Sequence, residues 1–180
     1  MDARPLSGLR VLDLGQVYNG PYCGMLLAAQ GADVVKVEPP GGEIVRRHAI
    51  SPGGASYSFL MLNSGKRGIV LDLKDARGRE VFLRLVERAD VVLENFRDDS
   101  VMRSLGLGWE VLSAANPRVV LASGRGYRAG SDYESFGAMD FTVQAISGHM
   151  AMTGFPDQPP VKAGATLCDM LGSTHLFAAI

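Results

Sequence analysis

The segment LRVLDLGQVYNGPYCGMLLAAQGADVVKV, residues 9–37, contains the clearest indication of the fold class. Its first part, LRVLDL at 9–14, has the run of Leu and Val that is typical of a buried strand, and DVVKV at 33–37 has the same character. Between them a glycine-containing turn leads into YCGMLLAAQ at 22–30, which predicts a helix, and Gly31 follows where helices commonly end. A strand, a helix and a strand within about 30 residues predict a βαβ unit, whose two strands are parallel.

The same alternation continues along the chain. It predicts further strands at 68–73, 91–94 and 118–123, and helices at 76–88, 98–115 (in two pieces), 141–150 and 168–180. These strands lack a strict polar alternation, as do parallel strands that are buried on both faces. We therefore expect an α/β protein with a Rossmann-like doubly wound fold, in which helices cover both faces of a parallel sheet.

Composition and charge exclude several classes of protein. Of 180 residues, 47% are hydrophobic and 21% are charged, which is ordinary for a globular chain and unlike a disordered or collagenous one. Lys and Arg number 18 against 19 Asp and Glu, so the formal charge is −1 and no basic field favours nucleic acid or an anionic membrane. No apolar run reaches the roughly 18 residues of a membrane helix. We expect neither a nucleic acid nor a membrane as partner.

The sequence offers no metal or disulfide pattern. Cys23 and Cys168 lie far apart with no second thiol beside either, which argues against a disulfide framework and a zinc site. His48, His149 and His175 have no common spacing. We expect no metal and no permanently bound cofactor, and we place the protein in a reducing cytoplasm by default.

The familiar nucleotide and hydrolase motifs are missing. No G-x-G-x-x-G follows the first strand, and G-x-x-x-x-G-K-[ST], H-E-x-x-H and G-x-S-x-G do not occur, which disfavours a classical NAD or ATP enzyme. Ligands of doubly wound sheets bind at the carboxyl ends of the strands. The cations near those ends are Lys74, Arg97, Arg103, Arg125 and Arg128. Together they suit a ligand that carries phosphates, although each alone is also typical of a solvated surface charge.

Asp169 lies at the start of the expected helix at 168–180. One interpretation is a helix cap or first-turn residue, which stabilises a helix by about 1 kcal/mol. The other is a nucleophile, because carboxylates form covalent acyl intermediates and the helix-terminal amides would keep this one ionised. Cys168 beside it has no neighbouring base and is typical of a small packed residue. Gln144 and Tyr127 are candidates to orient an acyl group or to make structural hydrogen bonds.

Five blocks of the chain resemble one known family in order. They are PLSGLRVLDLGQVYNGPYCGMLLAAQGADVVKVEPPGG (5–42), NSGKRGIVLDLKDARGREVFLRLVERADVVLENFR (63–97), NPRVVLASGRGY (116–127), MDFTVQAISGHMAMTG (139–154) and PPVKAGATLCD (159–169). The family is that of the class III CoA-transferases, which includes formyl-CoA transferase and carnitine CoA-transferase and is related to 2-methylacyl-CoA racemase. The resemblance implies an enzyme that transfers coenzyme A from an acyl-CoA thioester to a carboxylic acid through a covalent aspartyl intermediate.

The resemblance also implies an architecture. Residues 1–180 would be the N-terminal part of a Rossmann-like, CoA-binding large domain, with a second, smaller domain beyond residue 180 and two chains interlocked as a homodimer. Family members are considerably longer, and this chain stops at HLFAAI within an apolar helix. We therefore expect it to be a piece of a longer protein.

Site residues are carried over from the family motif by motif. Asp169 matches the catalytic aspartate. Coenzyme A or acyl-CoA, as substrate, would contact Val17, Tyr18, Asn19, Leu71, Asp72, Leu73, Lys74, Asn95, Phe96, Arg97 and Arg103. The three cations of this set would meet the phosphates, and Phe96 would face the adenine or the pantetheine arm.

Three positions depart from the relatives' patterns. Tyr18 stands where the formyl-CoA branch has glutamine, so the mouth of the thioester site differs, and Arg103 has one extra residue before the following Leu-Gly. Met139 stands where the racemases have the histidine of a His-Asp pair, which favours transfer over racemisation. Two alternatives remain open: a racemase with Asp140 or Asp169 as base and His149 opposite, and a truncated, non-catalytic CoA-binding protein.

Overall fold

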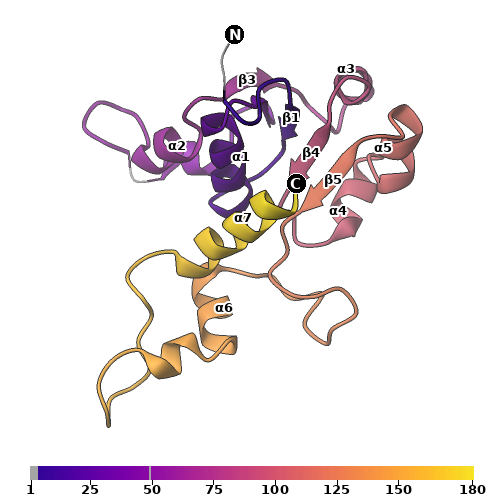
Figure 1. Ribbon diagram of the computed structural model, residues 1–180. Helices are drawn as coiled ribbons and strands as arrows, with labels where there is room; N and C mark the ends of the chain where they lie inside the picture. The colour runs from indigo at the N-terminus through magenta and orange to yellow at the C-terminus, as the bar shows by residue number, and fades with distance from the viewer. Residues whose placement is uncertain (1–3, 49) are drawn as a thin grey trace.

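Five parallel strands form the centre of the molecule (Figure 1). The computed structural model describes residues 4–48 and 50–180. The strands are β1 (Arg10–Asp13), β2 (Asp33–Glu38), β3 (Arg67–Val70), β4 (Val91–Glu94) and β5 (Val120–Ser123), and they are arranged β3-β2-β1-β4-β5. All four neighbouring pairs are parallel. The expected doubly wound α/β fold is confirmed.

Helices connect the strands and cover the sheet. They are α1 (Asn19–Ala29), α2 (Tyr57–Leu62), α3 (Ala76–Val86), α4 (Asp99–Ser104), α5 (Trp109–Ala115), α6 (Asp140–Ile146) and α7 (Leu167–Ala179), with short 3-10 helices η1 (Ile44–Arg47) and η2 (His149–Met152). Gly31 ends α1 with a φ of 103°, as expected of a glycine there. The sequence did not predict α2 or η1, because each is too short to show a helical period.

Two hydrophobic clusters fill the two faces of the sheet. On one face, strand residues such as Leu12 and Val92 pack with Phe82 of α3 and Leu112 of α5. On the other face, Val34 packs with residues of α1, and the apolar C-terminal part of α7 lies against this cluster. Full burial of each Val, Leu or Phe side chain stabilises the folded state by about 1.5–3 kcal/mol relative to leaving it exposed. The two layers hold β1 and β4 at the centre of the sheet, and the site lies at their carboxyl ends.

The chain reverses its direction of travel across the sheet between β1 and β4. From β1 it moves outward to β2 and β3, and from β4 it moves outward in the other direction to β5. The loops after β1 and β4 are therefore adjacent, which makes this the topological switch point. Beyond β5, α6 and η2 extend away from the sheet, and α7 returns to lie along α1 (Figure 1). No helix in the described part of the chain is long and apolar enough to span a membrane.

Candidate active site at the switch point

The loop after β1 is held by side chains from elsewhere in the chain. Its peptide N–H groups at 15, 16 and 17 donate in turn to Asp13, Asn95 and Glu43, over 2.7, 2.6 and 2.9 Å. Val17 has a φ of 62°, a conformation that β-branched residues rarely adopt. The bonds fix the loop, and they also occupy three N–H groups that a ligand could otherwise have used.

The loop after β4 locks onto the loop after β1. Asn95 Nδ2 donates to the carbonyl of Gln16 over 2.9 Å, completing a two-bond clamp between the two loops. Beneath it, Glu94 is fully buried, accepts from the N–H of Phe96 over 2.7 Å, and forms an ion pair with Arg125 at 2.7 Å. Phe96 and Arg97 follow directly, so their positions are set by this buried network.

Asp169 lies in the first turn of α7 but does not cap this helix. The N–H groups of Cys168 and Asp169, in the first turn of α7, donate to Oδ1 of Asp140 over 2.8 and 3.3 Å. Asp140 is buried, and Gln144 donates to its other oxygen over 2.7 Å. Among residues 4–48 and 50–180, no group donates a hydrogen bond to the Asp169 carboxylate. Asp169 does lie in the first turn of α7, as one interpretation expected, but Asp140 and not Asp169 accepts the N–H groups there.

Burial of Asp169 and the nearby negative charge of Asp140 raise the pKa of the Asp169 carboxyl from 3.8 to about 6. The helix amides that were expected to keep Asp169 ionised bind Asp140 instead. A carboxylate with this pKa is mostly ionised at neutral pH and is poorly solvated, which makes it more reactive than an exposed aspartate. Cys168 has a raised pKa through burial and the charges of Asp140 and Asp169, so its thiol stays protonated.

Asp169 lines two cavities, both of which are also lined by the loop after β4. One has a volume of about 440 Å³ and contains Val17, Tyr18, Asn19, Asn95, Phe96 and Arg97 of the expected set. The other, of about 370 Å³, shares Asn19, Asn95, Phe96 and Arg97. The structure thus brings the residues of the first and third expected segments together around the carboxylate.

The second expected segment lines a neighbouring cavity. Leu71, Asp72, Leu73 and Lys74 surround a space of about 310 Å³, and Gln16, Phe96 and Val101 belong both to this cavity and to the larger one at Asp169. Phe96 is therefore one of three residues at which the two cavities meet. Among the described residues, no ion pair engages Lys74.

Arg103 stands apart from the other expected residues. It lines a separate, open cavity of about 530 Å³ together with Asp98, Asp99 and Glu134, and this cavity shares no lining residue with the three others. Acidic neighbours around Arg103 do not favour a phosphate. Its expected contact with the nucleotide stays a prediction.

Several other sequence candidates are engaged elsewhere. Arg125 pairs with Glu94 and Asp99, and is not a free cation for a ligand. Gln144 is fully buried and bonds Asp140 and the N–H of Ala163, so its role is structural. His149 and His175 line none of the four cavities described above. Within the described residues no cluster of ligating side chains could hold a metal ion.

The sequence did not reveal every residue of the cavity at Asp169. Phe141, Lys162 and Thr166 also line it. They come from the arm that leaves β5 and returns to α7, and no strand-end rule places that arm over the switch point. Only the packing of α7 on α1 and α6 brings it there.

Comparison with known proteins agrees with this geometry. Residues 6–180 match the family model of CoA-transferase family III. The chain is 43% identical over 178 residues to acetyl-CoA:oxalate CoA-transferase of Acetobacter aceti, covering 98% of this chain and 46% of that protein. It is 44% identical over 188 residues to succinyl-CoA:mesaconate CoA-transferase of Haloarcula hispanica, covering 97% and 47%.

A solved structure matches as well. The crystal structure of a CAIB/BAIF family protein from Brucella suis superposes with a TM-score of 0.92 at 36% identity, over 98% of this chain and 48% of that one. The chain thus spans about half the length of the relatives that it matches.

Proposed function

The chain belongs to CoA-transferase family III, and from this premise we propose that the intact protein transfers coenzyme A from an acyl-CoA to a carboxylic acid through a covalent intermediate on Asp169. One observation carries the proposal. The carboxylate of Asp169 lies in a cavity, has a raised pKa, and receives no hydrogen bond from the described residues. It does not bind the N–H groups of the first turn of α7, because those of Cys168 and Asp169 donate to Asp140.

We propose that coenzyme A lies across the two cavities that meet at Phe96. The nucleotide end occupies the cavity of residues 71–74, where Lys74 supplies a cation for phosphate. The pantetheine arm passes Phe96, and the thioester reaches Asp169. Coenzyme A is a substrate here and not a resident cofactor.

The proposed chemistry runs in four balanced steps. The Asp169 carboxylate attacks the thioester carbonyl, and a mixed anhydride forms as CoA thiolate leaves. The thiolate attacks the aspartyl carbonyl, which gives an aspartyl-CoA thioester and the free donor acid. The acceptor carboxylate attacks that thioester and releases the thiolate again. Attack of the thiolate on the acceptor's carbonyl forms the new acyl-CoA and regenerates Asp169.

The oxyanions of these steps need hydrogen-bond donors. Backbone N–H groups of the glycine-containing loop after β1 would be natural donors, but those of residues 15, 16 and 17 already donate to Asp13, Asn95 and Glu43. These three N–H groups are therefore not available to an oxyanion, and the donors have to be other groups.

A transfer assay tests the proposal against racemisation. We expect acyl-CoA and a second carboxylic acid, supplied as a panel that includes dicarboxylic acids, to yield the second acyl-CoA with little net hydrolysis. The alternative predicts uptake of deuterium at the α-carbon of a 2-methylacyl-CoA in heavy water, with no acceptor acid present. Met139 in place of histidine, and a cavity at Asp169 to which the described histidines do not contribute, favour transfer. Deuterium uptake without transfer would refute the proposal.

Activity should fall in acid. Only ionised Asp169 attacks the thioester, and its pKa is raised to about 6, so the rate of acylation should decline as the pH falls through about 6. Asp140→Asn keeps an oxygen for the N–H of Cys168 but removes the negative charge, so the decline should move to lower pH. Single-turnover rates measured against pH check this, with Asp132→Asn, an exposed aspartate, as control. An unmoved acid limb in Asp140→Asn would contradict the assignment.

Three expectations stay predictions at this point. They are the smaller second domain, the interlocked homodimer and the cytoplasmic location. The acceptor acid is also open, because the named relatives act on different acids, among them oxalate and mesaconate.

A further inference from the structure

Glu43 is a buried carboxylate that the proposed mechanism does not use. Glu43 is only 3% exposed. It follows β2 and caps the N-terminus of η1. Oε1 accepts from the N–H of Val17 over 2.9 Å and from the N–H of Val45 over 3.2 Å. Thus one oxygen joins η1 to the loop after β1.

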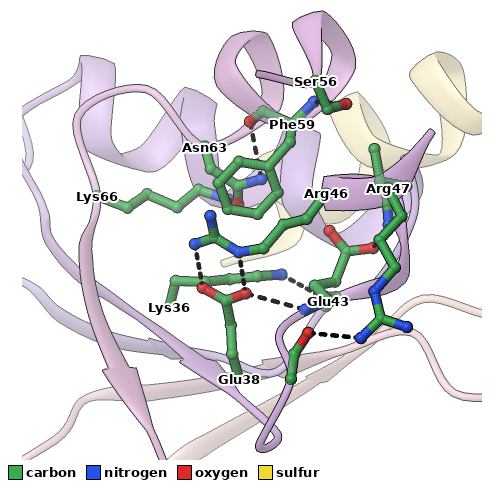
Figure 2. A network of polar contacts seen from close by, with 12 residues as sticks. Lys36, Glu38, Glu43, Arg46, Arg47, Ser56, Phe59, Asn63 and Lys66 are labelled. Carbon is green, nitrogen blue, oxygen red and sulfur yellow. Dashed lines mark hydrogen bonds and ion pairs between the residues drawn. The ribbon is translucent and has the colours of Figure 1, made fainter. Parts of the chain in front are cut away.

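A chain of polar contacts fixes Glu43 in turn. Its N–H donates to Oε2 of Glu38 over 2.9 Å, and Arg46 binds both oxygens of Glu38 over 2.6 and 2.7 Å. The guanidinium of Arg46 lies 3.7 Å from the centre of the Phe59 ring, so it is held between that ring and Glu38 (Figure 2). Burial favours the neutral form of Glu38, but the bonds from Arg46 and Glu43 outweigh it and lower the pKa of this carboxyl. The bidentate pair gives the network a fixed orientation.

The N–H group that Glu43 accepts from in the loop after β1 belongs to a residue with a strained backbone. Val17 has a φ of 62°, where a β-branched residue is destabilised and persists only when its surroundings impose it. Tyr18 and Asn19 follow Val17 directly, and all three residues line the cavity that contains Asp169. A relaxed Val17 would change the direction of the chain at Tyr18 and Asn19, against the bonds that their side chains make with Ser58 and with the carbonyl of Asp169.

We propose that Glu43 is a positioning residue for the CoA site: by holding the N–H of Val17, it keeps the strained turn and so fixes Tyr18 and Asn19 beside Asp169. Glu43 does not itself line that cavity. The inference rests on the proposed function for its kinetic consequence, and on geometry alone for its effect on the loop.

Glutamine at this position is the informative conservative variant. Its Oε1 accepts the same two bonds, while its amide group occupies the place of Oε2, which has no hydrogen-bond partner among the described residues. Glu43→Gln should therefore retain the turn, and Glu43→Ala should lose it. Glu87→Ala removes an exposed glutamate at the end of α3 and serves as the matched control.

The experiment measures the intact protein in two ways. Hydrogen exchange over residues 15–22 should be about tenfold faster in Glu43→Ala, since a bond that protects the Val17 amide is lost. The KM for acyl-CoA should rise, and kcat/KM should fall about tenfold to a hundredfold, because misplacement of binding groups costs rates of that order. Glu43→Gln and Glu87→Ala should stay close to wild type in both.

A coupled variant tests whether Glu43 acts through Val17. Glycine adopts a φ of 62° without strain, so Val17→Gly alone should unfold near the wild-type temperature with a faster-exchanging loop. In that background Glu43→Ala should raise KM less than it does beside Val17. If Glu43→Ala does not fold by itself, the double variant Val17→Gly/Glu43→Ala is compared with Val17→Gly to decide whether Glu43 acts through Val17.

The outcomes separate the two claims. Unchanged exchange and KM in Glu43→Ala, or a lower unfolding temperature with KM unchanged, overturns the positioning role. Fully additive effects of the two substitutions overturn it as well. Failure of the wild-type protein to bind coenzyme A refutes the proposed function instead, and the exchange measurement then still decides whether Glu43 holds the loop.

Discussion

Replacement of Asp169 by asparagine should lower kcat about 10⁴-fold or more, because an amide cannot form the anhydride with the acyl group. Binding of coenzyme A should persist, since Asp169 contributes one side chain to a cavity that many residues line. Asp132→Asn, in an exposed loop, should leave kcat unchanged. The comparison uses transfer assays and calorimetric titration with coenzyme A on the intact protein.

Asp169→Asn should be slightly more stable than the wild-type protein above pH 6. The pKa of Asp169 is raised from 3.8 to about 6, so its protonated form is favoured by the fold. The stability that protonated Asp169 contributes to the wild-type protein is fully present below pH 3.8 and is lost as the pH rises through about 6. Asparagine has no charge to desolvate, and its advantage should vanish in acid. A destabilised variant with lost activity would indicate a structural role for Asp169 instead.

The second large effect is expected at Asp13, under the loop after β1. Asp13 is fully buried, accepts from Lys66 over 2.6 Å and lies near buried Lys36, whose ammonium bonds the carbonyl of Gly15. Burial alone would raise the pKa of Asp13, but Lys36 and Lys66 outweigh it and the pKa is lowered. Asp13→Ala leaves both ammonium groups without their counter-charge and should cost about 3–5 kcal/mol of unfolding free energy.

An exposed ion pair provides the control for that substitution. Asp33 binds Arg67 at 2.7 Å with both side chains largely exposed, so Asp33→Ala should cost less than about 1 kcal/mol. Denaturant unfolding of both variants measures the difference. The contribution of Asp13 is present above the unfolded pKa of 3.8 and is lost as the pH falls through its lower folded value. Equal losses in the two variants would show that burial adds nothing to the Asp13 pair.

The sequence predicted the parts of the fold that short-range patterns determine. The strand at 91–94 was predicted to the residue, because an apolar run is bounded by polar residues on both sides. The βαβ unit and the order of elements followed from the same alternation. The sequence did not predict α2, whose six residues show no period. Nor did it show that Asp13 and Lys66, 53 positions apart, form a buried pair.

The sequence predicted only the parts of the site that lie in single segments of the chain. The family resemblance indicated the residues after β1 and β4, and the topology brings these together at Asp169. The sequence could not show that Asp140 takes over the capping of α7, because that bond joins residues 28 positions apart. It therefore could not show that the pKa of Asp169 is raised. Nor could it show that Arg46 binds the buried carboxylate of Glu38.

Mass mapping of the intact protein during turnover shows whether Asp169 carries the acyl group. Hydroxylamine added in the steady state should convert an acylated side chain to a hydroxamate, and the peptide that carries it should place the modification on residue 169. We expect that adduct with every acyl-CoA that supports transfer, and none in Asp169→Asn. Transfer that proceeds while residue 169 stays unmodified, or an adduct on Cys168 or Asp140 instead, would contradict the account.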